Sequence, residues 1–204
     1  MRAVLLVGLP GCGKSTLAAA IPGVVEINRD GIRERLFGSR RHHAHEGAVS
    51  REHARLIRLH AGRGDDLVIS DTLTQRRSRR DLIRVLKELG YRVEVWVFDV
   101  GEATCQARNQ ARSEPVPAEV IGRMSRRLKD APPSLDEGID ALRLIRQDGV
   151  EPLLSPADSV REGCESPHPA EASTERARAR RPSRRGEAER GREAERAPED
   201  CAPR

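Results

Sequence analysis

Aromatic residues and cysteines are rare in this sequence. One Trp, one Tyr and two Phe make up the aromatic 2% of 204 residues, so the stacking platforms on which many single-strand-binding proteins rely are scarce. The four cysteines, Cys12, Cys105, Cys164 and Cys201, lie far apart and form no CxxC pair. This spacing argues against a zinc site or a disulfide framework and fits a reducing cytosol.

Long hydrophobic runs are also missing. No apolar stretch is long enough to cross a bilayer. The apolar run at residues 3–7 leads directly into glycines and has no cleavage site, so it predicts a first strand rather than a signal peptide. We therefore predict a cytoplasmic protein that does not associate with membranes.

Large apolar residues nearly disappear after residue 155. We predict a folded domain over residues 1–155 and a disordered tail rich in Arg, Glu, Ala and Pro over residues 156–204, because the tail cannot bury enough surface to offset its ordering entropy. The first part carries 26 basic and 21 acidic side chains, and the second carries 11 of each. The positive excess therefore lies on the folded part. It suits a polyanionic ligand, although a solvated Arg-rich surface explains it equally well.

In the folded part, short apolar runs alternate with helical patterns. This alternation predicts an α/β domain of three layers with a mostly parallel sheet. We expect strands at 3–7, 24–27, 67–70 and 92–100, and helices at 15–20, 29–37, 48–61, 76–89, 102–111 and 118–129. Residues 139–146 fit either a last strand or a helix.

The first predicted strand is followed by GLPGCGKST, which satisfies GxxxxGK[ST] between a strand and a helix. Glycines allow backbone N–H groups to surround phosphates, and the helix N-terminus adds a favourable dipole. Together with the alternating strands and helices, the motif therefore predicts a three-layer P-loop NTPase fold that binds ATP with Mg²⁺. The residues expected to bind the nucleotide are Gly8, Gly11, Cys12, Gly13, Lys14, Ser15 and Thr16.

Two members of this loop and one later carboxylate have specific expected roles. Lys14 is one of only three lysines, against 34 arginines, and it can place a compact charge between the β- and γ-phosphates. The Ser15 hydroxyl can join the Mg²⁺ shell. Asp71 ends the third predicted strand, at the sheet edge where nucleotides bind, and is the other candidate metal ligand. The alternative for Asp71 is a helix N-cap or a turn aspartate.

The segment after the second predicted strand indicates an acceptor. Asp30 lies at a carboxyl end of the sheet and can accept the proton of an attacking hydroxyl group. Arg33, one helical turn later, can hold a phosphate or orient Asp30. An exposed ion pair at a helix start explains the same two residues without any function.

Taken together, these segments resemble the phage-type polynucleotide 5′-hydroxyl kinases. The resemblance covers nearly all of residues 3–130 and rests on GLPGCGKST, INRDGIRERLFG, VISDTLTQRRSRRDLI, YRVEVWVFDVGEATCQARNQAR and VPAEVIGRMSRRL, in the family's order and at similar spacing.

The resemblance implies a role for each matching residue. Lys14 and Ser15 hold the ATP phosphates and Mg²⁺, Asp30 is the general base on the 5′-hydroxyl group, and Arg33 contacts the acceptor. Arg108 and Arg112 are implied to be lid arginines over ATP and the transferring phosphoryl group. Independently, two arginines four residues apart share a helix face and can close over negative charge. In an Arg-rich protein they are equally well explained as solvated surface residues.

The chain also departs from that family. The bifunctional phage enzyme carries a 3′-phosphatase domain with a DxDGT-type motif, and this motif does not occur here. The resemblance thus implies a kinase domain alone, with a nucleic acid 5′-hydroxyl end as partner and a part in nucleic acid repair. Because aromatic residues are few, we keep two alternatives: a kinase of a small-molecule hydroxyl (nucleoside, sugar or antibiotic), and an ATP-binding or ATPase module without an acceptor.

A small histidine cluster, His42, His43 and His45, follows the second predicted helix. A metal site needs further ligands that the sequence does not indicate, so we predict a solvent-exposed loop there.

Overall fold

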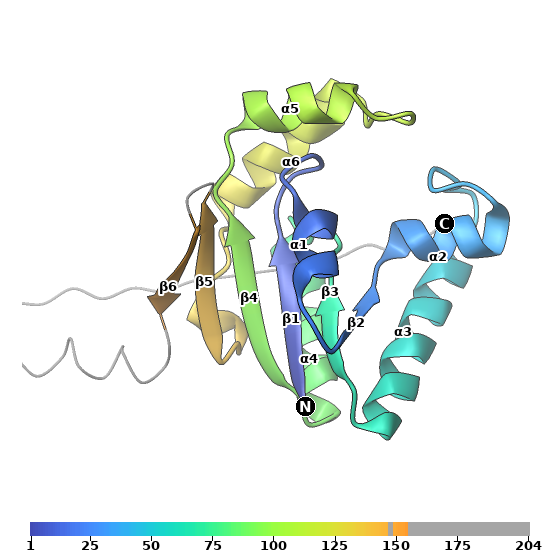
Figure 1. Cartoon of the computed structure of the whole chain (residues 1–204), viewed down its shortest axis with the longest axis vertical. Coiled ribbons are helices and arrows are strands. Elements are labelled where there is room, and N and C mark those ends of the chain that lie inside the picture. Colours follow the sequence, from blue (N-terminus) through green and yellow to red (C-terminus); the bar gives the residue numbers. More distant parts are fainter. Residues whose placement is uncertain (147–148, 155–204) are drawn as a thin grey trace, which may run out of the picture. The chain divides into compact units, whose positions relative to one another are not determined.

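Six strands form a single sheet in this computed structural model, which describes residues 1–146 and 149–154 (Figure 1). The strands are β1 (Arg2–Val7), β2 (Val24–Ile27), β3 (Asp66–Ile69), β4 (Arg92–Phe98), β5 (Ala141–Arg146) and β6 (Gly149–Leu154). Their order is β2-β3-β1-β4-β5-β6. The first five are parallel, and β6 runs antiparallel to β5. The predicted mostly parallel α/β fold is confirmed.

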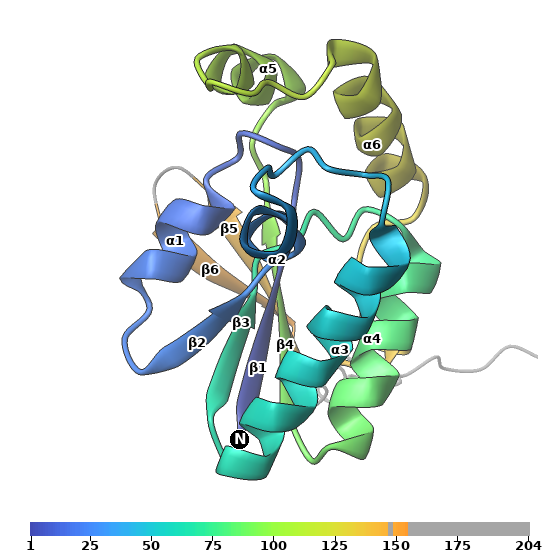
Figure 2. The same ribbon diagram turned by 90° about the vertical axis from the view of Figure 1, so that its right-hand side faces the viewer.

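Helices cover both faces of this sheet. They are α1 (Lys14–Ala20), α2 (Arg29–Phe37), α3 (Glu46–Arg63), α4 (Arg76–Glu88), α5 (Glu102–Gln110) and α6 (Ala118–Asp130), with a short 3₁₀ helix at Leu135–Glu137. Figure 2 shows α1 on one side of the sheet and α3 and α4 on the other, with α5 above its carboxyl edge. Within the described residues, no helix is both long enough and apolar enough to cross a bilayer.

Strand β1 is the centre of the core. Residues 3–7 are completely buried, and their side chains alternate between two apolar clusters, as strand geometry requires. Leu5 packs in the cluster that contains Ile57 of α3 and Ile83 of α4, whereas Leu6 packs in the cluster that contains Ala18 of α1. Burial on both faces explains the continuous apolar run of this strand.

The last two strands refine the sequence analysis. The segment at 139–146, which fits a strand or a helix, contains β5. The sequence analysis does not predict β6, whose sequence GVEPLL contains a proline that obscures a strand pattern. The predicted boundary after residue 155 and the predicted tail at 156–204 lie outside the described residues and stay predictions.

The strand order indicates at which edge of the sheet a ligand would bind. Strand β1 lies between β3 and β4, so the chain leaves it in one direction for β2 and β3 and later returns on its other side with β4. In open parallel sheets, ligands bind outside the carboxyl ends of the strands at such a switch point. The loop that follows β1 is the phosphate loop.

Candidate functional site

A cleft of about 890 Å³ opens at this carboxyl edge. It is lined by the phosphate loop, the first turn of α2, the residues after β3 and the loop that follows α5. The predicted site residues that line it are Gly11, Gly13, Lys14, Ser15, Thr16, Asp30, Arg33, Asp71 and Arg112. Three others, Gly8, Cys12 and Arg108, are not among its lining residues.

The loop conformation requires glycine at two positions. Gly11 has φ +87° and Gly13 has φ +107°, which side-chain-bearing residues rarely adopt. A Cβ on Gly11 would lie only 2.3 Å from the Cys105 carbonyl oxygen. Gly11 therefore allows the loop to pass directly against α5.

Gly8 and Cys12 contribute to packing beneath the loop. A Cβ on Gly8 would lie 2.7 Å from Cys12 Sγ, and the Gly8 amide donates to the Thr72 carbonyl oxygen at 3.2 Å. Cys12 is buried. Both residues thus lie behind the cleft surface, where they fix the path of the loop.

Lys14 is a buried cation that has no carboxylate partner among residues 1–146 and 149–154. Its Nζ donates to the carbonyl oxygens of Gly8 and Leu9, both at 2.9 Å, and lies 3.7 Å from Cys12 Sγ. Burial holds the pKa of Lys14 below its ordinary value. Contact with Cys12 raises this pKa and partly offsets the effect of burial, whereas the positive charge of Arg112 lowers it further. Because an unneutralised buried charge is costly, the site favours an anion, and the phosphates of a nucleotide fit it.

Ser15 and Asp71 are the candidate oxygen ligands for Mg²⁺. Ser15 is exposed in the first turn of α1, and Asp71 lines the same cleft from the end of β3. Hydroxyl and carboxylate oxygens suit this hard cation. Asp71 Oδ1 also accepts a hydrogen bond from the Arg29 amide at 2.8 Å, so Asp71 ties β3 to the start of α2. The position of Asp71 is therefore compatible both with a metal ligand and with a purely structural aspartate.

Asp30 and Arg33 form a close pair on α2. Asn28 caps this helix by accepting from the Gly31 amide at 2.6 Å. One turn of helix brings Arg33 Nη1 to 2.6 Å from Asp30 Oδ1. The Asp30 side chain is 62% exposed, whereas that of Arg33 is only 9% exposed. The carboxylate is thus accessible to an incoming group, and the guanidinium behind it is fixed.

Glu46 is what fixes Arg33, and sequence analysis does not find it. From the start of α3, its two oxygens accept from Arg33 Nε at 2.8 Å and Nη2 at 3.1 Å, and Arg29 Nη1 lies 3.3 Å away. The hydrogen bond from Arg33 is the largest cause that lowers the pKa of Glu46 from 4.5 to about 2. The ion pair also raises the pKa of Arg33, although burial opposes this.

Two further contacts were not predicted. His53 of α3 is buried, and its Nε2 lies 3.4 Å from Asp71 Oδ2. Across the cleft, Arg41 Nη2 donates to the Glu114 carbonyl oxygen at 2.6 Å, which joins the α2–α3 loop to the loop after α5. No local pattern indicates these contacts, because each joins segments that only the fold brings together.

The two predicted lid arginines differ in position. Arg112 lines the cleft just after α5, and its charge reaches Lys14. Arg108 is exposed on α5 and is not among the lining residues. The geometry therefore brings Arg112, but not Arg108, to the rest of the site.

The histidine cluster lies in the loop between α2 and α3. The rings of Phe37, His42 and His45 contact one another, with centroids 4.6–5.3 Å apart. His43 Nδ1 lies 3.1 Å from Glu46 Oε1. In residues 1–146 and 149–154 no group of three or more His, Cys, Asp or Glu side chains is arranged to hold a metal ion.

A buried ion pair supports the loop that carries Asp71. Arg79 of α4 and Glu137 are both almost fully buried and pair at 2.6 Å. Arg79 also donates to the carbonyl oxygens of Leu73 at 3.1 Å and Ala131 at 2.8 Å. Leu73 has φ +46°, an uncommon value for a residue other than glycine. Arg79 therefore stabilises the turn that leads from β3 into α4.

Comparison with known proteins places this architecture in context. The model of the AAA domain family matches residues 4–131, well over half of the chain. A chain of the Pnkp1/Rnl/Hen1 RNA repair complex has a TM-score of 0.56 and 23% identity, and the match covers 63% of this chain and 44% of that chain. A chain of the PezAT chromosomal toxin–antitoxin system of Streptococcus pneumoniae has a TM-score of 0.57 and 19% identity, covering 79% of this chain and 77% of that one.

These structural likenesses concern the fold, which is that of a P-loop domain. The chain spans less than half of the length of the repair-complex chain. No curated protein matches it.

Proposed function

This chain belongs to the AAA domain family, and we propose that it is an ATP-dependent kinase that transfers the γ-phosphoryl group to the 5′-hydroxyl group of a polynucleotide. One observation carries this proposal. An accessible carboxylate, Asp30, lines the same cleft as the phosphate-loop residue Lys14. A module that only binds ATP has no need of such a carboxylate on the acceptor side.

The residues divide the chemistry among them. Lys14 and the loop amides bind the phosphates, and Arg112 adds positive charge where negative charge develops during transfer. Asp30 accepts the proton of the acceptor hydroxyl group as its oxygen forms the new bond to the γ-phosphorus. The bond from that phosphorus to the bridging oxygen breaks, and ADP leaves with the electron pair.

Mg²⁺ fits beside Ser15 and Asp71, and when bound it neutralises charge on the β- and γ-phosphates. The role of Arg33 in this scheme is to hold Asp30 in place from behind, since their 2.6 Å contact fixes one carboxylate oxygen. The other oxygen is left to accept the proton.

The polynucleotide acceptor is supported by the resemblance of residues 3–130 to the phage-type 5′-hydroxyl kinases. One structural feature favours a small-molecule hydroxyl instead. Three carboxylates, Glu26, Glu34 and Glu114, also line the cleft, and carboxylates accept hydrogen bonds from the hydroxyl groups of sugars and nucleosides. This kinase of small hydroxyl compounds is the second candidate.

One assay distinguishes the candidates. The protein is incubated with γ-labelled ATP, Mg²⁺ and a 5′-hydroxyl oligonucleotide, and in parallel with the same oligonucleotide already carrying a 5′-phosphate. We expect label on the first oligonucleotide and none on the second. In further parallel incubations nucleosides, sugars or antibiotics replace the oligonucleotide, and label on one of these compounds instead supports the second candidate. Release of labelled phosphate without any labelled acceptor contradicts both and leaves an ATPase module.

A further inference from the structure

The exposed face of α4 carries five cations that the catalytic scheme does not use. They are Arg76, Arg77, Arg80, Arg84 and Lys87, and all are exposed. At about 100° per residue, these positions fall within an arc of about 100° on the helix and extend over about 16 Å. The same helix buries Ile83, which lies beside this arc, and Leu86, which lies further round the helix, in the core, so the orientation of the cationic face is fixed.

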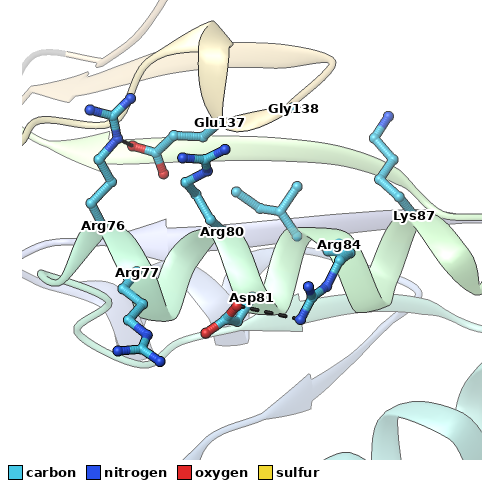
Figure 3. Close-up of a pocket in the computed structure, with 9 residues that line it drawn as sticks. Arg76, Arg77, Arg80, Asp81, Arg84, Lys87, Glu137 and Gly138 are labelled. Atoms are coloured by element: carbon cyan, nitrogen blue, oxygen red, sulfur yellow. Dashed lines mark hydrogen bonds and ion pairs between the residues drawn. The ribbon is translucent and has the colours of Figure 1, made fainter.

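This face borders a surface hollow of about 590 Å³ between α4 and the Glu137–Gly138 turn. Figure 3 shows Arg76, Arg80 and Lys87 extending to the side of that turn, while Arg77 and Arg84 extend toward the other side of the helix. The five side chains therefore spread to both sides of the exposed surface of α4.

Acidic neighbours neutralise this face only partly. Arg84 lies 3.4 Å from Asp81, Lys87 lies 2.5 Å from Asp140, and Arg76 pairs with Asp136. These three pairs are exposed to solvent, where an ion pair stabilises little and its members can exchange partners. Arg76 Nε also lies 3.9 Å from the buried Glu137. In the part of the chain that the structure describes, Arg77 and Arg80 have no ion-pair partner within 4.0 Å.

Clustering of like charge on one helix costs stability. Like-charged residues four apart, such as Arg76 and Arg80, repel each other by a few tenths of a kcal/mol. The first turn of α4 contains no acidic residue, and its N-cap residue Gln75 makes no side-chain capping bond. The positive end of the helix dipole thus adds to the same field.

We propose that this face of α4 is a docking surface for the phosphate backbone of the polynucleotide acceptor. The proposal rests on the proposed function and extends it to acceptor length. Forked guanidinium groups match phosphate oxygens, and about 16 Å of helix accommodates several phosphates of a single strand. The face begins only five residues after Asp71, at the edge of the sheet where the cleft opens.

The test compares two double variants. Arg77→Ala with Arg80→Ala removes the two charges of α4 that have no ion-pair partner within 4.0 Å among the described residues, although the charge of Arg80 still acts on Asp136. Arg58→Ala with Arg63→Ala removes two charges from exposed positions of α3 and is the matched control. Binding of a labelled single strand of about 20 nucleotides is measured by fluorescence anisotropy at several salt concentrations.

We expect the α4 variant to bind the strand about tenfold more weakly, and its salt dependence to lose a slope of about 1.4, which corresponds to two phosphate contacts. The control variant should change binding less than twofold. Unchanged binding of the α4 variant, or an equal loss in the control, overturns the proposal. Arg77→Gln with Arg80→Gln repeats the test with side chains that keep most of the original volume.

A second measurement separates this proposal from the proposed function. The KM for the long acceptor should rise in the α4 variant, while kcat and the KM for a nucleoside 3′-monophosphate stay unchanged, because one nucleotide cannot reach from the cleft along α4. An equal loss on both acceptors contradicts docking on α4. If wild type phosphorylates neither acceptor, the kinase proposal fails, whereas the anisotropy result still decides whether α4 binds the strand.

Discussion

All polar contacts of Lys14 that the structure records lie within six residues of it in sequence. On the acceptor side of the same cleft, Arg33 is held by Glu46, which is thirteen residues away and belongs to another helix. Asp71, which ties down the start of α2, lies 42 residues from the amide that it binds. The lysine of the phosphate loop is therefore held by local contacts, and the loop around it touches distant segments at Thr72 and α5. Arg33 and the start of α2, in contrast, depend on tertiary contacts.

This difference has a mechanical consequence. The phosphate loop takes its form from glycine dihedral angles, from the close contact of Gly11 with α5 and from the hydrogen bond of the Gly8 amide to Thr72. The acceptor side takes its form from a chain of charged hydrogen bonds through Asp30, Arg33 and Glu46. Substitutions in the loop should therefore disturb nucleotide binding and transfer together, whereas substitutions on the acceptor side should leave nucleotide binding intact.

The largest expected effect is that of Lys14→Ala, which removes the buried charge from the nucleotide-binding side of the cleft. Loss of a charge that binds the transferring phosphoryl group should lower kcat/KM by about 10³-fold or more, and ATP affinity should fall as well. Both are measured by labelled-ATP transfer and by equilibrium ATP binding.

Lys129→Ala provides the matched control, since Lys129 is exposed on α6 and its loss should leave both quantities within twofold of wild type. If Lys14→Ala bound ATP normally, the assignment of Lys14 to the phosphates would be wrong.

Asp30→Asn tests the acceptor side with an almost isosteric change. Without a group that accepts the proton, transfer should fall by about 10²–10⁴-fold, while the Kd for ATP stays within twofold of wild type. Glu34→Gln, one turn further along α2 and also in the cleft, is the control and should retain most activity. A strong loss of ATP binding in the Asp30 variant would contradict the division of the cleft into two sides.

The same contrast explains what the sequence could predict. The phosphate loop is recognisable because its motif is a run of consecutive residues, and β1 because it is buried on both faces. Asp30 and Arg33 were predicted because one turn of helix necessarily brings them together. Their roles, like those of the other site residues, stay predictions.

Glu46 and His53 were beyond sequence reasoning for a physical reason. Both lie on α3, and no periodic pattern on that helix relates them to α2 or to the end of β3. The contact of Glu46 with Arg33 exists only because α3 packs beside α2, and the contact of His53 with Asp71 only because α3 packs beside β2 and β3. Arg108 shows that helical spacing from Arg112 does not by itself place a residue in the lining of the cleft, and its role stays a prediction.

The smallest expected effect is that of a substitution at Glu46. It is the most specific test of the tertiary contacts on the acceptor side, because Glu46 touches neither reactant in the proposed scheme. Glu46→Gln keeps one hydrogen-bond acceptor but loses the charge that holds Arg33. We expect kcat/KM for the acceptor to fall about tenfold, as for loss of a positioning contact, and the KM for ATP to stay unchanged. Glu52→Gln is the control, because Glu52 lies on the same helix and pairs with two exposed arginines, Arg35 of α2 and Arg55 of α3.

The pH dependence of stability gives an independent measure of the same contact. Folding lowers the pKa of Glu46 from 4.5 to about 2, so its ion pair stabilises the folded state above about pH 4.5, and this stabilisation is lost as the pH falls toward about 2. The difference in free energy of unfolding between wild type and Glu46→Gln, measured by urea denaturation, should therefore be largest near neutral pH and shrink through that window. A difference that did not change with pH would mean that the charge of Glu46 does not hold Arg33, and the tertiary origin of the acceptor side would lose its main support.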